Sequence, residues 1–98
     1  MPYKIFETKE FSRIFITLDN NEKLWITNQI LKLKENITGK PLRFSWFREK
    51  KFLNKRLYFL INEKKQVIIL VAFGDKKDQK EIINFISNNW RDIINLYY

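Results

Sequence analysis

The chain has 98 residues, a formal net charge of +8, and neither cysteine nor histidine. Its length and its hydrophobic fraction of 45% predict one folded domain and exclude a disordered chain. The missing residue types exclude disulfides, thiolate nucleophiles, cysteine metal sites and most hydrolase arrangements, so an enzyme built from this chain must move protons with lysine, arginine, tyrosine, aspartate or glutamate.

The first third of the chain predicts a short strand followed by two helices. Partial alternation predicts the strand over Tyr3–Phe6. Apolar residues spaced at three and four predict amphipathic helices over about 8–18 and about 21–36. Asp19, Asn20 and Asn21 break the pattern between them, and any of the three can cap the second helix. So short a turn predicts an antiparallel helical hairpin.

The middle of the chain changes to the two-residue period of strands. Gly39 suits the left-handed position past a helix, and Pro41 cannot continue one. Alternation from Leu42 through Trp46 predicts a strand, and so does alternation over Arg56–Ile61. In the second of these, one face holds Leu57, Phe59 and Ile61, and the other holds Arg56, Tyr58 and Leu60.

The last third predicts a buried strand and a long helix. Val67–Phe73 is apolar on both faces, as expected of a central strand covered on two sides. Asp78 with Glu81 predicts a capping box that opens the helix. The apolar stripe of that helix consists of Ile83, Ile86, Trp90, Ile93 and Tyr97, and is widened beyond what one small sheet can cover by Ile82, Phe85, Ile94 and Leu96.

The predicted element order is β-α-α-β-β-β-α, in a single domain over residues 1–98. This order indicates an α+β fold in which the N-terminal helical hairpin packs on a small antiparallel sheet, with a C-terminal helix appended. The longest apolar run, Val67–Phe73, has seven residues, far short of the roughly 20 needed to span a bilayer. We therefore expect a cytoplasmic protein with no membrane contact.

Most of the net charge lies in one segment, residues 40–56. The segment has one acidic residue, Glu49, and carries +6 of the net +8. Its basic residues are Lys40, Arg43, Arg48, Lys50, Lys51, Lys55 and Arg56. Aromatic residues lie between these cations, and that mixture suits a polyanion whose bases can stack. Composition fits equally well a solvated hairpin whose aromatics are core and whose lysines keep a sheet edge soluble.

Four short segments, in this order, resemble a known family. They are Gly39–Leu42, Phe47–Phe52, Lys55–Leu60 and Val71–Lys77. With the element order, they resemble the RelE/ParE toxin superfamily over about residues 24–82, and most closely the archaeal RelE-like mRNA interferase toxins. The resemblance implies a RelE-like fold and the toxin of a type II toxin–antitoxin system. It further implies a ribosome-dependent, metal-independent endoribonuclease that cleaves mRNA by 2′-hydroxyl attack, with no cofactor.

The resemblance also implies a cationic site. Arg56 matches the strand arginine that contacts the scissile phosphate, and Lys76 matches a second catalytic arginine. Arg48, Lys50 and Lys51 lie where RelE toxins place a lysine pair, and the spacing to Arg56 does not fix which of them correspond; Lys50 and Lys51 are taken as the catalytic candidates. The implied RNA-binding residues around these four are Lys40, Arg43, Arg48, Lys55, Lys77 and Tyr58.

One departure from the family pattern concerns the proton acceptor. Ile82 stands where the best-known RelE toxins have a tyrosine that helps to deprotonate or orient the 2′-hydroxyl. Tyr58, Tyr97 and Tyr98 are the candidates to replace that tyrosine. A lysine crowded by other cations has a lowered pKa and can act as base or acid, whereas an arginine stays charged and can bind two phosphate oxygens.

The expected partners are a cognate RelB-like antitoxin, the ribosome and mRNA. We expect the antitoxin to be acidic and to cover residues 40–56, while a homodimer through the last helix stays open. Two other functions also stay open. One is a catalytically inactive RelE-fold protein that binds nucleic acid or an antitoxin-like partner, which Ile82 and Lys76 favour. The other is a ParE-like poison of DNA gyrase.

Overall fold

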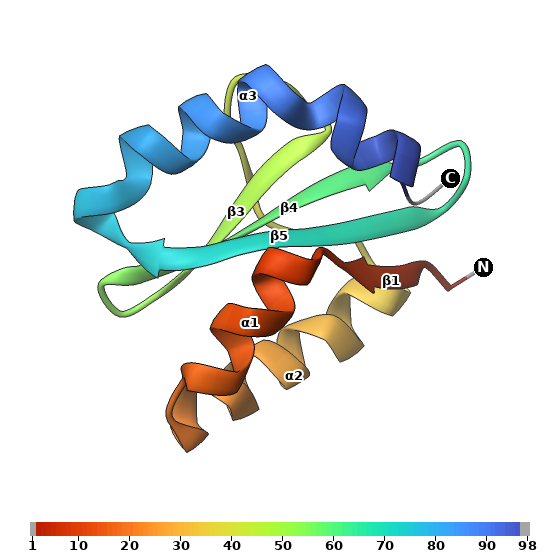
Figure 1. The fold of residues 1–98 in the computed structure, drawn as a ribbon. Coiled ribbons are helices and arrows are strands. Elements are labelled where there is room, and N and C mark those ends of the chain that lie inside the picture. Colours follow the sequence, from red (N-terminus) through yellow and green to blue (C-terminus); the bar gives the residue numbers. More distant parts are fainter. Residues whose placement is uncertain (1, 97–98) are drawn as a thin grey trace.

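The computed structural model describes residues 2–96, which form one sheet between two helical layers (Figure 1). The strands are β1 (Lys4–Glu7), β2 (Lys40–Pro41), β3 (Phe47–Phe52), β4 (Lys55–Asn62) and β5 (Val67–Asp75). The helices are α1 (Lys9–Thr17), α2 (Asn20–Glu35) and α3 (Gln79–Leu96), with a 3-10 turn η1 (Lys76–Asp78) before α3. The strand order is β1-β5-β4-β3-β2. Helices α1 and α2 cover one face and α3 covers the other, which confirms the predicted α+β fold.

Local capping fixes the helical hairpin. Thr8 Oγ1 accepts a hydrogen bond from the Phe11 N–H at 3.1 Å at the start of α1. Asp19 is the residue that caps α2, because its Oδ1 accepts from the Glu22 N–H at 2.8 Å while Glu22 Oε1 accepts from the Asp19 N–H at 3.2 Å. Leu18 and Asp19 are the two residues between the helices, so the chain reverses abruptly, as predicted.

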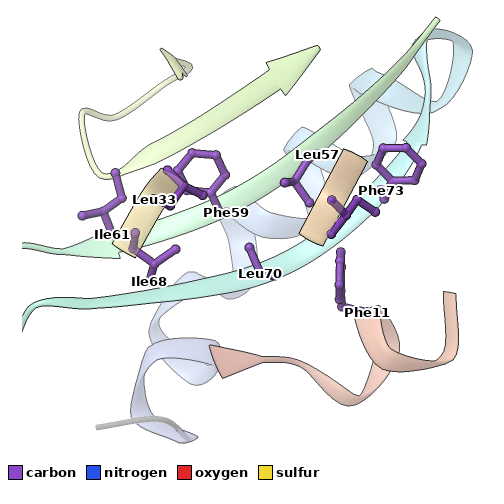
Figure 2. Packing of buried hydrophobic residues seen from close by; sticks show 9 residues of the cluster. Phe11, Leu33, Leu57, Phe59, Ile61, Ile68, Leu70 and Phe73 are labelled. Carbon is purple, nitrogen blue, oxygen red and sulfur yellow. The ribbon is translucent and has the colours of Figure 1, made fainter. Parts of the chain in front are cut away.

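Each face of the sheet has its own hydrophobic core. The side of β4 that carries Leu57 and Phe59 packs against the helical hairpin, and Figure 2 shows this cluster with Phe11 and Leu33 from the helices. The opposite side of β4, with Tyr58 and Leu60, packs against α3. This is the division of faces that the alternation predicted. The buried residues of β5 divide between the same two clusters, so its central position is confirmed.

The direction of the first strand differs from the prediction. β1 pairs in parallel with β5, Lys4 opposite Val67 and Glu7 opposite Leu70, whereas the other strand pairs are antiparallel. The sheet is therefore mixed rather than wholly antiparallel. Side-chain alternation is the same for either direction, so it could not reveal this pairing.

Two predicted local structures are wrong. Residues 42–46 form a loop rather than a strand, because the Leu42 N–H donates to Phe47 O at 2.9 Å and the Phe47 N–H donates to Phe44 O at 3.1 Å. These bonds close a turn, and β3 begins only at Phe47. Asp78 lies inside η1, which runs directly into α3, so it is not the N-cap of that helix.

The surplus apolar surface of α3 is smaller than predicted. Ile82 and Ile94 pack against the α3-side core. Phe85 and Leu96 are exposed, by 56% and 78%. Tyr97, the last predicted member of the stripe, lies outside the described residues. Within residues 2–96, no helix is long and apolar enough to cross a membrane.

Candidate functional site

Strand alternation divides the basic segment between the two faces of the sheet. Lys51 lies opposite Arg56 in the β3–β4 pair, and Lys50 lies opposite Leu57. Residues directly opposite each other in an antiparallel pair point to the same face. Lys51 therefore shares the α3 face with Arg56, whereas Lys50 shares the helical-hairpin face with Leu57. The four predicted catalytic residues are thus not brought together as one set.

Lys50 is engaged on the helical-hairpin face. Its Nζ donates to Thr38 Oγ1 at 2.7 Å. Burial, and then the positive charge of Lys32, lower the pKa of Lys50. The sequence predicted a lowered lysine pKa, but the larger cause is burial and the sheet separates this lysine from Arg56. Arg48 points to the same side as Phe59, and its Nε donates to Ser45 O at 3.0 Å.

Lys55, at the start of β4, connects the β3–β4 turn to α2 through an ion pair. Its Nζ forms an ion pair with Glu22 and lies 5.6 Å from the centroid of the Phe73 ring. The hydrogen bond to Glu22 raises the pKa of Lys55 against a smaller opposing effect of desolvation. Lys55 therefore lies on the helical-hairpin side, away from the face of Arg56.

The aromatic residues of the segment serve mainly as packing. Phe47 is fully buried under α3, as predicted. Trp46 stacks on Phe44 with ring centroids 4.5 Å apart and contacts Trp90 at 4.6 Å. Phe44, at the end of this stack, is 39% exposed.

Arg56 lies in a buried polar cluster between the sheet and the start of α3. We call Arg56, Glu49, Tyr58 and Gln79 the Arg56 cluster. The Nε of Arg56 is 3.6 Å from Glu49 Oε2, and Gln79 Nε2 donates to the same oxygen at 3.0 Å. The side chains of Arg56 and Glu49 are only 11% and 9% exposed. The predicted open sheet face around Arg56 is therefore wrong, because α3 covers it.

Two polar groups of the Arg56 cluster are buried without a hydrogen-bond partner in the described part of the chain. They are Arg56 Nη1 and the Tyr58 hydroxyl. An unpaired buried polar group costs about 1–3 kcal/mol, so folded proteins rarely contain one without a reason. A catalytic or binding role is one of the reasons for which a folded protein keeps such groups unpaired.

Tyr58 is fully buried, so the predicted contact between its ring and RNA is wrong. Burial, and then the negative charge of Glu49, raise the pKa of Tyr58 to about 12, while Arg56 acts in the opposite direction. A phenol with this pKa keeps its proton at neutral pH and cannot act as a base. As a base, Tyr58 therefore does not replace the tyrosine missing at Ile82, and the other two candidates, Tyr97 and Tyr98, lie outside the described residues.

A cationic groove of about 470 Å³ lies beside the Arg56 cluster, between β2 and the start of α3. Its lining consists of Lys40, Pro41, Leu42, Arg43, Gln79, Lys80 and Ile83. Lys40 lies opposite Glu49 in the β2–β3 pair, and Arg43 Nη2 donates to Asn84 Oδ1 on α3 at 2.6 Å. Gln79 belongs to both the groove and the cluster, so it joins the cationic surface to Glu49 and Arg56.

Lys76 and Lys77 are exposed at the same end of the sheet as Arg56. The Lys76 N–H donates to Asn54 O at 3.0 Å, which holds η1 beside the β3–β4 turn. Gly74, two residues before Lys76, is the β5 partner of Arg56. Ile82 packs over Gly74 so closely that a Cβ added there would lie 3.0 Å from Ile82 Cδ1.

Sequence reasoning missed three residues of this site. Glu49 received no catalytic role, and Gln79 and Lys80 were not considered. The alternation of Phe47, Glu49 and Lys51 was the available signal, since it places Glu49 and Lys51 on the side of the buried Phe47. This alternation alone does not show that Glu49 lies beside Arg56, because that also depends on the register of β3 against β4.

No protein-family model matches the chain, and no curated protein matches it. Solved structures do match. A mutant of the E. coli toxin RelE in the free state is 15% identical and has a TM-score of 0.71, over 88% of this chain and 99% of that chain. An archaeal RelE–RelB complex from Pyrococcus horikoshii is 13% identical, with a TM-score of 0.65 over 78% of this chain and 97% of that one.

A RelBE toxin–antitoxin complex from Mycobacterium tuberculosis is 17% identical, also with a TM-score of 0.65, over 78% of this chain and 100% of that chain. At these identities the likeness shows the fold. The chain has the RelE fold, as its sequence resemblance predicted.

Proposed function

We propose that this chain is the toxin of a type II toxin–antitoxin system and that it cleaves mRNA on the ribosome without a metal. The observation that carries the proposal is Arg56, which has an unpaired buried Nη1 beside a cationic groove. The RelE fold adds to it, since the matched structures are described as toxins and toxin–antitoxin complexes.

Arg56 is the proposed ligand of the scissile phosphate. An arginine stays charged and can bind two phosphate oxygens with its planar fork. Lys51 lies directly opposite Arg56, and like charges in such a pair destabilise a sheet. A bound polyanion removes this repulsion, so the pair is better suited to RNA binding than to stability. Lys76, at the same end of the sheet, is the proposed third cation at the phosphate.

The remaining cations divide into two proposed RNA surfaces. Lys40, Arg43 and Lys80 line the groove and would hold the phosphates next to the cleaved one. Lys77 extends this surface beyond η1. Arg48 and Lys50 point to the opposite side of the sheet, where they are suited to ribosomal RNA rather than to the cleaved strand.

Cleavage of a messenger on programmed ribosomes tests the proposal. Purified protein should cut the messenger within the codon of the A site and leave a 2′,3′-cyclic phosphate, which primer extension and end analysis detect. The Arg56→Gln variant is the control and should leave the messenger intact. Uncut messenger with the folded wild-type protein would overturn the endoribonuclease function.

A second candidate function is a RelE-fold protein that binds RNA or an antitoxin-like partner without cleavage. The pairing of Arg56 with Glu49 favours it, because the carboxylate neutralises the arginine that cleavage needs. In the same experiment this protein would bind ribosomes and leave the messenger whole. A ParE-like poison would also leave it whole, but would trap gyrase on cleaved DNA.

We further propose an acidic, RelB-like antitoxin as the partner of the toxin. A groove of about 450 Å³ lies between α1 and α3. Its apolar lining includes Val71, Phe85, Ile93 and Leu96, and Lys9, Glu10 and Asp92 are among its polar residues. An amphipathic segment can place its apolar side there, and an acidic continuation of it can reach Lys40, Arg43 and Lys80 in the separate cationic groove, so that charge speeds encounter and apolar contact slows release. A homodimer through the same apolar surface is the alternative.

A further inference from the structure

Cleavage by a 2′-hydroxyl needs a proton acceptor beside the group that holds the phosphate. Three titratable side chains share the α3 face with Arg56 on neighbouring strands: Glu49, Lys51 and Tyr58. A lysine ordinarily keeps its proton at neutral pH, and the pKa of Tyr58 is raised to about 12. Only a carboxylate in this set is ordinarily free to take up a proton.

We infer that Glu49 accepts the proton of the attacking 2′-hydroxyl. This inference rests on the proposed endoribonuclease function and assigns its base to a residue other than the lysines. Lys50, whose pKa is lowered, is the competing base, but it points to the other face and donates to Thr38. The contact between Glu49 and Arg56 places the acceptor next to the phosphate ligand.

Glu49 is held in one orientation. Its Oε2 lies 3.6 Å from Arg56 Nε and accepts the Gln79 hydrogen bond at 3.0 Å. Since both contacts use Oε2, we assign the incoming proton to Oε1. A base whose orientation is fixed before RNA arrives loses little entropy when it reacts, which is how positioned groups accelerate a step.

One neutral side chain separates Glu49 from the cationic groove. Gln79 lines the groove and is half-buried, so a change of its rotamer can open a path to the carboxylate while α3 stays in place. Such rotamer changes are fast compared with helix movements. Lys40, opposite Glu49 on β2, keeps the entrance positive, so the carboxylate does not repel the RNA backbone.

The reaction balances with groups on this face. The 2′-oxygen forms a bond to phosphorus as its proton passes to Glu49, and the bond from phosphorus to the 5′-oxygen breaks. The leaving 5′-oxygen takes a proton from the ammonium of Lys51, and Arg56 stabilises the charge on the phosphorane oxygens. The products are a 2′,3′-cyclic phosphate and a 5′-hydroxyl, and water exchanges protons with Glu49 and Lys51 to restore both.

Single-turnover cleavage of ribosome-bound messenger by the full chain tests the inference. Glu49→Gln keeps the size of the side chain and an acceptor for Gln79 but leaves Arg56 without its anion, so thermal unfolding should show a folded but less stable protein. Its cleavage rate should fall by a factor of about 100 or more, the usual loss when a general base is removed. Asp78→Asn is the matched control, because this exposed carboxylate at the start of α3 also influences Tyr58, and it should cleave near the wild-type rate.

The pH profile separates a base from a residue that only positions Arg56. With a carboxylate base, the wild-type rate should rise with pH along an acidic limb of the profile. Arg56, Tyr58 and Lys40 face Glu49 from β4 and β2, and Gln79 faces it from α3. Glu49→Gln should lose this limb, whereas Glu49→Asp should keep it at a lower rate. A limb that survives in Glu49→Gln would overturn the inference.

A substrate with sulfur in place of the leaving 5′-oxygen gives a second readout, because a thiolate leaves without a proton. Glu49→Gln should stay slow on this substrate. Recovery of its rate would mean that Glu49 protonates the leaving group, which overturns the assignment as a base. If Glu49→Gln cleaves the messenger at the wild-type rate, this inference alone is overturned. If the wild-type protein leaves the messenger intact, the proposed function is overturned as well.

Discussion

Lys50 and Lys51 are neighbours in the chain but point to opposite faces of the sheet. Lys51 is exposed on the α3 face, directly opposite Arg56, whereas Lys50 lies on the helical-hairpin face and donates to Thr38. The dense positive charge of residues 40–56 is therefore not one surface. This division decides which cations can act on one phosphate and makes the two lysines a matched pair for experiment.

We expect Lys51→Ala to slow single-turnover cleavage by a factor of about 100 or more, since it removes a cation from the scissile phosphate and the proposed donor to the leaving group. Lys50→Ala should change the rate much less at saturating ribosome concentration, because the sheet lies between Lys50 and Arg56. The two variants carry the same loss of charge, so their difference reports position. Equal losses in both would contradict the division into two faces.

A second prediction concerns the stability of the Arg56–Glu49 pair. Arg56→Gln should lower the free energy of unfolding by about 3 kcal/mol, because it leaves the buried Glu49 carboxylate without its cation. Adding Glu49→Gln should recover much of this loss. Urea denaturation of the wild type, both single variants and the double variant gives the coupling energy. A coupling energy near zero would mean that the 3.6 Å contact contributes nothing to the fold.

The faces of β4 could be predicted from the sequence because each face has its own core, and burial enforces the alternation of Leu57, Tyr58 and Phe59. The register of β3 against β4 could not be predicted from the sequence. It depends on the turn at Leu53 and Asn54, where Leu53 takes a φ of 56° that side chains rarely adopt. No glycine marks this turn.

Without that register, a single glutamate among seven basic residues indicates only charge neutralisation. The contact between Glu49 and Arg56, and the hydrogen bond from Gln79 thirty residues further along the chain, arise from tertiary packing. The covering of Arg56 by α3 was missed for the same reason. The wide apolar stripe of α3 was visible, but its place over the α3-side face of β4 was not.

Tyr58→Phe should stabilise the protein at neutral pH, because it removes a buried hydroxyl whose unpaired state costs about 1–3 kcal/mol. It should also change the response to alkaline pH. The folded protein keeps the Tyr58 proton up to a pKa of about 12, whereas the unfolded chain releases it near the ordinary value of 10.0. Unfolding therefore releases a proton in this window, and wild-type stability falls as the pH rises through it.

Denaturation of both proteins at several pH values between neutral and the upper pKa measures this difference. The stability gap between Tyr58→Phe and the wild type should widen as the pH passes 10.0. A constant gap would mean that the hydroxyl titrates normally in the folded protein. The comparison is sound because the two proteins share all other titratable groups.

The last prediction concerns the apolar groove between α1 and α3. Phe85→Ser should weaken binding of the acidic antitoxin about tenfold or more, because burial of a phenylalanine contributes about 1.5–3 kcal/mol. Leu31→Ser is the matched control, since Leu31 is 57% exposed on α2 and Phe85 is 56% exposed on α3. Titration calorimetry with the proposed antitoxin should show weaker binding for Phe85→Ser and unchanged binding for Leu31→Ser. Association should also slow as salt is added, because the cations of the groove beside Lys40 and Arg43 attract an acidic partner over a distance that salt shortens.

Light scattering of the isolated protein at low micromolar concentration decides between the two proposed occupants of this groove. A monomer that binds the antitoxin through Phe85 supports antitoxin docking. A tight dimer that Phe85→Ser dissociates would instead assign Phe85 and Leu96 to a second copy of the chain. The antitoxin would then have to bind elsewhere, and the cationic groove beside Lys40 and Arg43 is the remaining surface whose charge suits it.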